Sequence, residues 1–288
     1  MPPTITEAHP PLPLDELKSI IDGFGALSLS GKKATIDRLV GIHPTTNVDW
    51  AGTWRYRRAR RLDPGDQPMT VDQLIWRKGV PASLGRANPA GYDVLYLADR
   101  QDTALQEARV GNDLAVVADF QIRPGRSVRI APIGELLQIH RTGRGAFAGD
   151  HSGDLTDMLN ACAVDDARSL LITDAFLLNC LVGHDDYELS SQVALSVFEK
   201  LPVVTAVAYP SVRQLGATNF VVRTEGFWDN WGVRAVRYGQ AHPLGMGFYR
   251  FSDTQGVDGI HIDGSLDWTP VAIPEETLLL DLLWTPTT

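Results

Sequence analysis

The stretch that decides this fold runs Gly85-Arg86-Ala87-Asn88-Pro89-Ala90-Gly91-Tyr92-Asp93-Val94-Leu95-Tyr96-Leu97-Ala98 and then, after three residues, Asp102-Thr103-Ala104-Leu105-Gln106-Glu107. A loop rich in glycine, proline and asparagine carries one arginine, and the apolar run that follows predicts a short strand. Thr103 and Gln106 fit the S/T-x-x-Q capping box, which predicts that a helix starts at Thr103 and holds Glu107 in its first turn. We therefore expect Arg86, Tyr96 and Glu107 at the mouth of one loop–strand–helix unit.

Polar residues also stand at the ends of strands predicted before and after this stretch. Residues 203–209 are rich in β-branched side chains and lead directly into Pro210 and Ser211, and Asn219 opens the next predicted strand. Upstream, residues 52–60 alternate as a strand, and five of the 26 lysines and arginines lie within positions 55–61. Alternation places Arg58 and Arg60 on one face of that strand.

Taken in order, these pieces resemble the RES domain family. The family pattern is a G-R-x-N loop, a strand ending in Tyr, a T/S-A-L/I-x-E helix start and a later P-S loop followed by Asn. The matching residues here are Gly85-Arg86-Ala87-Asn88, Tyr96, Thr103-Ala104-Leu105-Gln106-Glu107, Pro210-Ser211 and Asn219, with Arg58-Ala59-Arg60 upstream. The resemblance covers residues 50–225.

This resemblance implies a function, a fold and a set of site residues. RES domains are mostly bacterial toxins that degrade NAD, held inactive by an antitoxin or immunity protein, and their fold is similar to that of ADP-ribosyltransferases. NAD would then be the substrate, with no bound cofactor or metal. The resemblance assigns catalytic roles to Arg86, Tyr96, Glu107 and Ser211, and ligand contacts to Arg58, Arg60, Asn88 and Asn219. The run of arginines at 57–61 lets the upstream alignment slip by one residue, so the arginine that contacts the ligand stays open.

These residue types suit the breaking of the bond between nicotinamide and ribose. Positive charge develops on the sugar as the bond breaks, and a carboxylate such as Glu107 stabilises it. The planar fork of Arg86 suits phosphate oxygens. Tyr96 offers a ring for stacking and a hydroxyl, and Ser211 offers a donor to the ribose or to the nicotinamide amide.

Net charge, cysteine content and the length of the apolar runs disfavour nucleic-acid-binding, disulfide-bonded and membrane-spanning proteins. A net charge of −9 disfavours direct nucleic-acid binding, which needs a broad basic surface. The two cysteines, Cys162 and Cys180, lie in apolar sequence and are expected to be reduced core residues of a cytoplasmic protein. The apolar runs are too short for a membrane span. His184-Asp185-Asp186 and His261-Ile262-Asp263 resemble common surface loops more than metal sites.

We expect an α+β fold, with a twisted, mostly antiparallel sheet flanked by helices. Residues 1–50 are predicted to form an added helical segment, residues 51–225 the catalytic core, and residues 226–288 a part packed on the same domain. Helices are expected near Leu14–Gly23, Gly31–Val40, Ala167–Val182 and Glu188–Lys200, and a further strand at Leu114–Ile122.

Two other functions remain open. The first is transfer of ADP-ribose to a protein or small molecule, which needs the same pocket and a different acceptor. The second is a non-catalytic nucleotide-binding module, favoured by Ala87 at a position where many RES domains have an aromatic residue. The sequence leaves the oligomeric state open, a homo-oligomer included.

Overall fold

The computed structural model describes residues 3–52, 54–76, 78–183 and 186–271, and the chain divides into two compact units. Unit 1 comprises Met1–Asp49, Ser83–Tyr92 and Arg129–Tyr209. Unit 2 comprises Trp50–Ala82, Asp93–Val128 and Pro210–Thr288. The segment predicted as a C-terminal part, 226–288, lies outside the described residues from position 272 onward.

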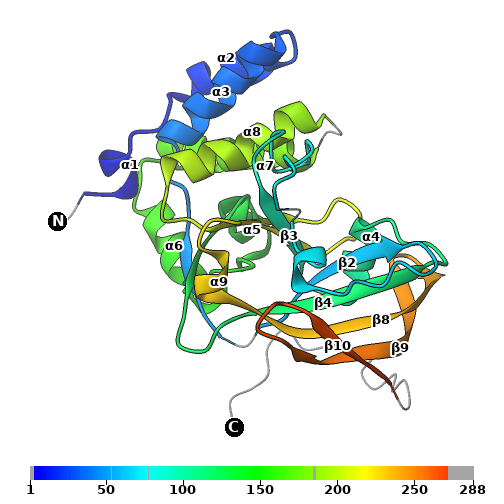
Figure 1. Ribbon diagram of the computed structural model, residues 1–288. Helices are drawn as coiled ribbons and strands as arrows, with labels where there is room; N and C mark the ends of the chain where they lie inside the picture. Colours follow the sequence, from blue (N-terminus) through cyan, green and yellow to red (C-terminus); the bar gives the residue numbers. More distant parts are fainter. Residues whose placement is uncertain (1–2, 53, 77, 184–185, 272–288) are drawn as a thin grey trace. The chain divides into compact units, whose positions relative to one another are not determined.

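Unit 2 is built on an antiparallel sheet. Its strands lie in the order β7-β3-β2-β4-β8-β9-β10, and each neighbouring pair is antiparallel. They are β2 (Tyr56–Leu62), β3 (Val94–Ala98), β4 (Leu114–Ile122), β7 (Thr218–Arg223), β8 (Trp231–Gly245), β9 (Phe248–Ile260) and β10 (Leu266–Pro270). Figure 1 shows β8 and β9 as long neighbouring strands. The predicted strands at 94–98 and 114–122 are confirmed.

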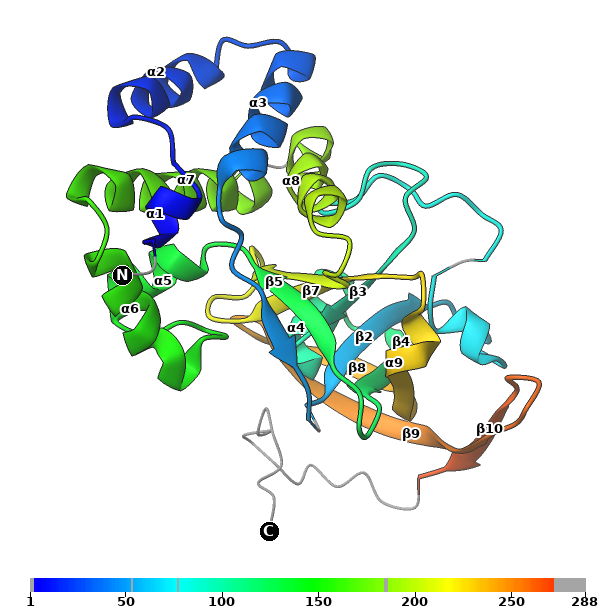
Figure 2. The ribbon, with the colours of Figure 1, turned by 90° about the vertical axis from the view of Figure 1, so that its left-hand side faces the viewer.

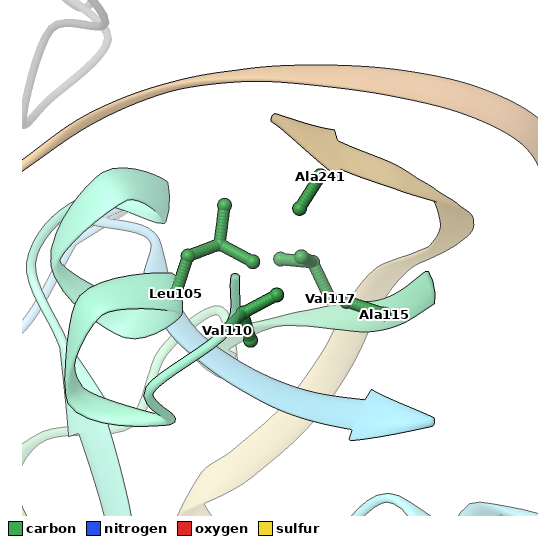
Figure 3. Packing of buried hydrophobic residues seen from close by; sticks show 5 residues of the cluster. All are labelled: Leu105, Val110, Ala115, Val117 and Ala241. Carbon is green, nitrogen blue, oxygen red and sulfur yellow. The ribbon is translucent and has the colours of Figure 1, made fainter. Parts of the chain in front are cut away.

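One face of this sheet carries helix α4 (Gln101–Glu107). Leu105 of α4 packs with Val110 against Ala115 and Val117 of β4 and Ala241 of β8, and all five are at most 3% exposed (Figure 3). Burial of apolar area of this kind stabilises by about 25 cal/mol per Å². The cluster therefore fixes the helix that bears Glu107 to the sheet.

The opposite face of the sheet is aromatic. Tyr56 of β2 makes edge contacts with Phe220 of β7 and Trp231 of β8, each at 4.9 Å between ring centroids. Phe227 of the short helix α9 (Phe227–Asn230) stacks on Trp231. The 3₁₀ turn η1 (Val71–Gln73) also belongs to unit 2. Both faces are covered, which explains why β4 reads as a continuous apolar run.

Unit 1 is mostly helical. Its helices are α1 (Ile5–Ala8), α2 (Leu14–Phe24), α3 (Leu29–Ile42), α5 (Glu135–Thr142), α6 (Ser152–Asn160), α7 (Val164–Val182) and α8 (Tyr187–Lys200), with the 3₁₀ turn η2 (Gly149–His151). Strands β1 (Val48–Trp50), β5 (Val128–Pro132) and β6 (Ala206–Pro210) fall almost wholly in this unit, and β5 and β6 are parallel. The four predicted helices correspond to α2, α3, α7 and α8.

The N-terminal helices pack on the long helices of unit 1. Figure 2 shows α3 against α8, and α2 contacts α7. Leu17, Ile36 and Leu39 are fully buried there. Asp37 of α3 also accepts hydrogen bonds from Gln192 and Ser196 of α8, each at 2.6 Å. Residues 1–49 therefore share a core with α7 and α8.

The architecture is α+β with a mostly antiparallel sheet, as predicted. Cys162 and Cys180 are buried free thiols. None of the helices in the described part of the chain combines the length and the apolar character that crossing a membrane requires.

Candidate functional site

Glu107 is the last residue of α4, where the sequence had placed it in the first turn. The prediction that the helix starts at Thr103 is wrong, because α4 begins at Gln101 after the extended residue Arg100. A capping threonine would accept a hydrogen bond from the backbone, but the hydroxyl of Thr103 donates to the carboxylate of Asp99 at 3.0 Å. The bond to Asp99 places Thr103 inside the helix and moves Glu107 one turn further along it.

Glu107 forms the centre of a polar cluster within unit 2, which we call the Glu107 cluster: Glu107, Ser211, Arg213 and Asn219. Oε1 of Glu107 accepts two hydrogen bonds of 2.6 Å, from Oγ of Ser211 and from Nδ2 of Asn219. Its other oxygen, Oε2, lies 3.6 Å from Nε of Arg213. The Glu107 side chain is 29% exposed, so one oxygen is fixed by neutral donors while the carboxylate still reaches solvent.

Ser211 shapes the loop that follows Pro210. Its hydroxyl oxygen accepts from the backbone N–H of Arg213 and of Gln214, each at 3.1 Å, and its own N–H donates to Ala217 at 2.8 Å. The hydroxyl hydrogen is donated to Glu107. The sequence had suggested that Ser211 donates to a ligand, whereas in the structure it holds the carboxylate and turns the loop that carries Arg213.

Asn219 and Tyr96 lie on the face of the sheet that carries α4. Asn219 pairs with Ala98 and Val221 pairs with Tyr96, and residues paired directly across antiparallel strands share a face. Asn219 is 5% exposed, so its amide is directed inward to Glu107, while Tyr96 is half-buried. The structure thus brings Glu107, Ser211 and Asn219 together and places Tyr96 on the same face.

The arginines of β2 divide between the two faces. Arg57 pairs with Ala98 and with Asp119, which places it on the α4 face, and Arg58 and Arg60 alternate to the other. Burial and then the charge of Arg60 lower the pKa of Arg58 to about 10, so it stays a cation at neutral pH.

The two arginines predicted to contact the ligand have local partners. Nη1 of Arg58 lies 3.5 Å from the carbonyl oxygen of Tyr96. Arg60 donates to the carbonyl of Gln73 at 3.1 Å and lies 3.6 Å from Asp66. Neither arginine forms an ion pair with Glu107 in the described part of unit 2. The structure does not bring Arg58 and Arg60 into the Glu107 cluster.

The sequence did not decide which arginine of positions 55–61 contacts the ligand. The strand register places the side chain of Arg57 on the face of the sheet that carries α4. It is 2% exposed, donates to the carbonyl of Asp99 at 2.7 Å and lies 3.9 Å from Asp119. Asp119 is equally buried and accepts from Arg237 at 3.2 Å. The sequence held a signal for this pairing, since an aspartate within the apolar run 114–122 must meet a cation when buried.

Arg86 and Asn88 lie in the loop of unit 1 that the sequence singled out. Asn88 is 2% exposed and donates to the carbonyls of Ser83 and Pro89, at 2.9 and 3.0 Å, which closes the loop. Arg86 donates to the carbonyl of Leu181 at 3.2 Å and lies 5.2 Å from the ring centroid of Tyr187. Asn88 therefore shapes the loop, and Arg86 joins the end of α7 to the start of α8.

The Glu107 cluster can place a negative charge at a fixed point. Two donors on one oxygen set the orientation of the carboxylate, and its second oxygen is left for a cation or a hydroxyl group. Among the residues that the structure describes, no group of three or more His, Cys, Asp or Glu side chains could hold a metal ion. His184 and Asp185 lie outside those residues.

Comparison with protein families matches residues 53–244 to the RES domain. The match contains Glu107, Ser211, Arg213 and Asn219, and also the loop with Arg86. A comparison with curated proteins finds no match to the chain. Because the family match spans more than half of the 288 residues, with the whole Glu107 cluster inside it, this chain belongs to the RES domain family.

Proposed function

We propose that this protein consumes NAD by breaking the bond between nicotinamide and ribose. The observation that carries the proposal is the Glu107 carboxylate, whose Oε1 is fixed by Ser211 and Asn219 while the group stays partly exposed. A fixed carboxylate stabilises the positive charge that develops on a sugar at the reacting carbon. Membership of the RES domain family supports the choice of NAD.

Breaking this bond does not require the protein to protonate the leaving nicotinamide. As the bond between C1′ and the nicotinamide nitrogen breaks, its electron pair goes to the nitrogen and neutralises the pyridinium. An oxygen of water or inorganic phosphate forms the new bond to C1′. With water, the products are nicotinamide, ADP-ribose and a proton released to solvent. Glu107 serves by stabilising charge and by accepting from a ribose hydroxyl.

The other site residues have separate tasks in this proposal. Arg213, at 3.6 Å from Oε2 of Glu107, supplies a cation beside the carboxylate for a phosphate oxygen. Tyr96 supplies a half-buried ring on the same sheet face as Asn219. For Arg86, which lies in unit 1, the family resemblance alone supports a contact with phosphate. In the cell, we propose that an antitoxin or immunity protein blocks this site.

The test is to incubate the purified chain with NAD, with and without inorganic phosphate, and to identify products by mass spectrometry. Free nicotinamide with ADP-ribose indicates hydrolysis, and free nicotinamide with phosphorylated ADP-ribose indicates phosphorolysis. The Glu107→Gln variant is the matched control. A contrary result is that the wild-type chain releases no nicotinamide and still binds NAD saturably in calorimetry. That result would contradict the proposed enzyme and support a non-catalytic nucleotide-binding module.

Transfer of ADP-ribose to another molecule is the second candidate. The partly exposed carboxylate of Glu107 supports this transfer equally, because the two reactions share every step up to the arrival of the acceptor. Mass spectrometry of a lysate treated with the protein and NAD separates the two. A stable mass increase of one ADP-ribose on a lysate component would favour transfer.

A further inference from the structure

Asp99 stands between β3 and α4 and uses its carboxylate to join two other parts of unit 2. Its Oδ1 accepts from the hydroxyl of Thr103 at 3.0 Å, and its Oδ2 accepts from the backbone N–H of Thr218 at 3.0 Å. The backbone N–H of Asp99 also donates to the carbonyl of Thr218 at 3.0 Å. One side chain therefore ties the helix α4 to the start of β7.

The two residues that donate to the Asp99 carboxylate, Thr103 and Thr218, lie near members of the Glu107 cluster in the chain. Thr103 precedes Glu107 by one helical turn on α4, and residues at this spacing lie on the same helix face. Thr218 is the residue directly before Asn219. The two bonds to Asp99 thus set the position of α4 relative to β7, and the 2.6 Å bond between Glu107 and Asn219 spans those same two elements.

Asp99 is itself held in place. Its carbonyl oxygen accepts from Nη1 of Arg57 at 2.7 Å, and Arg57 is buried beside Asp119 at 3.9 Å. Thr103 is fully buried, so its hydroxyl depends on Asp99 in a place where an unmade hydrogen bond is costly. The linkage from Arg57 through Asp99 to Thr103 is anchored in the sheet.

We infer that Asp99 is a positioning residue, which holds Glu107 of α4 and Asn219 of β7 at hydrogen-bonding distance through Thr103 and Thr218. The expected effect of Asp99 on turnover rests on the function proposed for Glu107. Asp99 does not touch the reacting atoms in this role. A purely structural role, in which Asp99 only secures the start of α4, is the alternative that the experiment must exclude.

The variant that separates the two roles is Thr103→Val, which keeps the shape of the side chain and removes only the bond to Asp99. Thr103→Ser restores a hydroxyl and is its matched control. We expect Thr103→Val to lower kcat for NAD about 10- to 100-fold with KM little changed, because small displacements of a catalytic group have effects of this size. Thr103→Ser is expected to recover most of the loss.

A cavity variant controls for lost stability. Val236 of β8 is 1% exposed and pairs with Ala118, on the face of the sheet opposite α4. Val236→Ala should lower the melting temperature and leave kcat close to that of the wild type. If Thr103→Val and Val236→Ala lower kcat to the same extent, Asp99 has only a structural role.

Combination with Glu107→Gln tests whether the effect passes through Glu107. For a positioning role, Thr103→Val should cause little further loss of turnover in the Glu107→Gln background, since the group it positions is already changed. Multiplied losses would overturn the inference. Both outcomes presuppose that the wild-type chain turns NAD over.

A readout without NAD keeps the inference testable if the proposed function fails. The side-chain amide of Asn219 gives its own pair of nuclear magnetic resonance signals, and a bond to a carboxylate shifts them and slows their exchange. Thr103→Val should move these signals toward those of a solvent-exposed asparagine, and Thr103→Ser should leave them near the wild-type positions. Unchanged signals in folded Thr103→Val would show that Asp99 does not position this pair.

Discussion

The side-chain amide of Asn219 donates to the carboxylate of Glu107 at 2.6 Å, although 112 positions separate the two residues in the chain. Ser211 shares the same acceptor oxygen from a loop 104 positions away. A carboxylate with two such donors has one orientation, which is what stabilising charge at one carbon atom demands. The predictions below follow from this arrangement and from the charges buried in each unit.

Glu107→Gln should bind NAD and lose most of its turnover. Glutamine keeps the shape of the side chain but removes the charge that opposes the developing cation, and loss of one electrostatic contact typically costs on the order of 10²- to 10³-fold in kcat. Nicotinamide release measures the turnover, and calorimetry measures the binding. Turnover close to that of the wild type would contradict the role given to Glu107.

Arg213→Ala should raise the KM for NAD by about tenfold and change kcat less, because it removes the cation beside Oε2 of Glu107. The effect should shrink as salt is added, since salt screens a partly exposed charge. Steady-state kinetics at low and high ionic strength check both points. If Arg213 merely masks the carboxylate, the variant would be faster than the wild type.

Arg86→Ala should weaken NAD binding and also destabilise unit 1. The second effect follows from the contacts of Arg86 with the carbonyl of Leu181 and the ring of Tyr187, which together are worth about 1–2 kcal/mol. Arg86→Lys is the matched variant, because it keeps the charge and loses the planar fork. Urea denaturation and NAD titration separate the effects, and an unaltered NAD affinity would remove Arg86 from the site.

His43 and Asp174 form a buried pair in unit 1, with Nε2 and Oδ1 separated by 3.9 Å. Burial, then the charge of Lys200, lowers the pKa of His43 to about 4, and burial raises the pKa of Asp174 to about 6. As the pH falls from 6 to 4, the histidine disfavours the folded state and the carboxyl group favours it, so the two contributions oppose each other.

Single variants of this pair should therefore show opposite pH dependence. Relative to the wild type, Asp174→Asn should lose free energy of unfolding as the pH falls from 6 to 4, by up to about 1.4 kcal/mol per pH unit, because only the histidine then titrates. His43→Gln should gain over the same range. Denaturation of the full chain at pH 4.5 and 6.5 measures both slopes. Parallel slopes in the two variants would contradict the opposite pKa shifts of His43 and Asp174.

The sequence alone predicted the strands β3 and β4, the helices α2, α3, α7 and α8, and the resemblance to the RES domain family. Apolar runs bounded by polar residues gave β3 and β4 their limits, since burial of a strand depends on its own side chains. Contacts between neighbours in the chain suffice for such elements. Glu107, Ser211 and Asn219 were assigned to one site because the order of their motifs resembles the RES domain pattern.

Only the tertiary structure decided which groups meet. The start of α4 depends on Asp99 taking the hydroxyl of Thr103, and Thr218, far along the chain, holds the other oxygen of that carboxylate. Arg57, rather than Arg58, turns toward α4 because pairing with β3 and β4 sets the register of β2. A shift of one residue in the pairing register moves every side chain of a strand to the other face of the sheet. Only pairing with strands distant in the chain fixes that register.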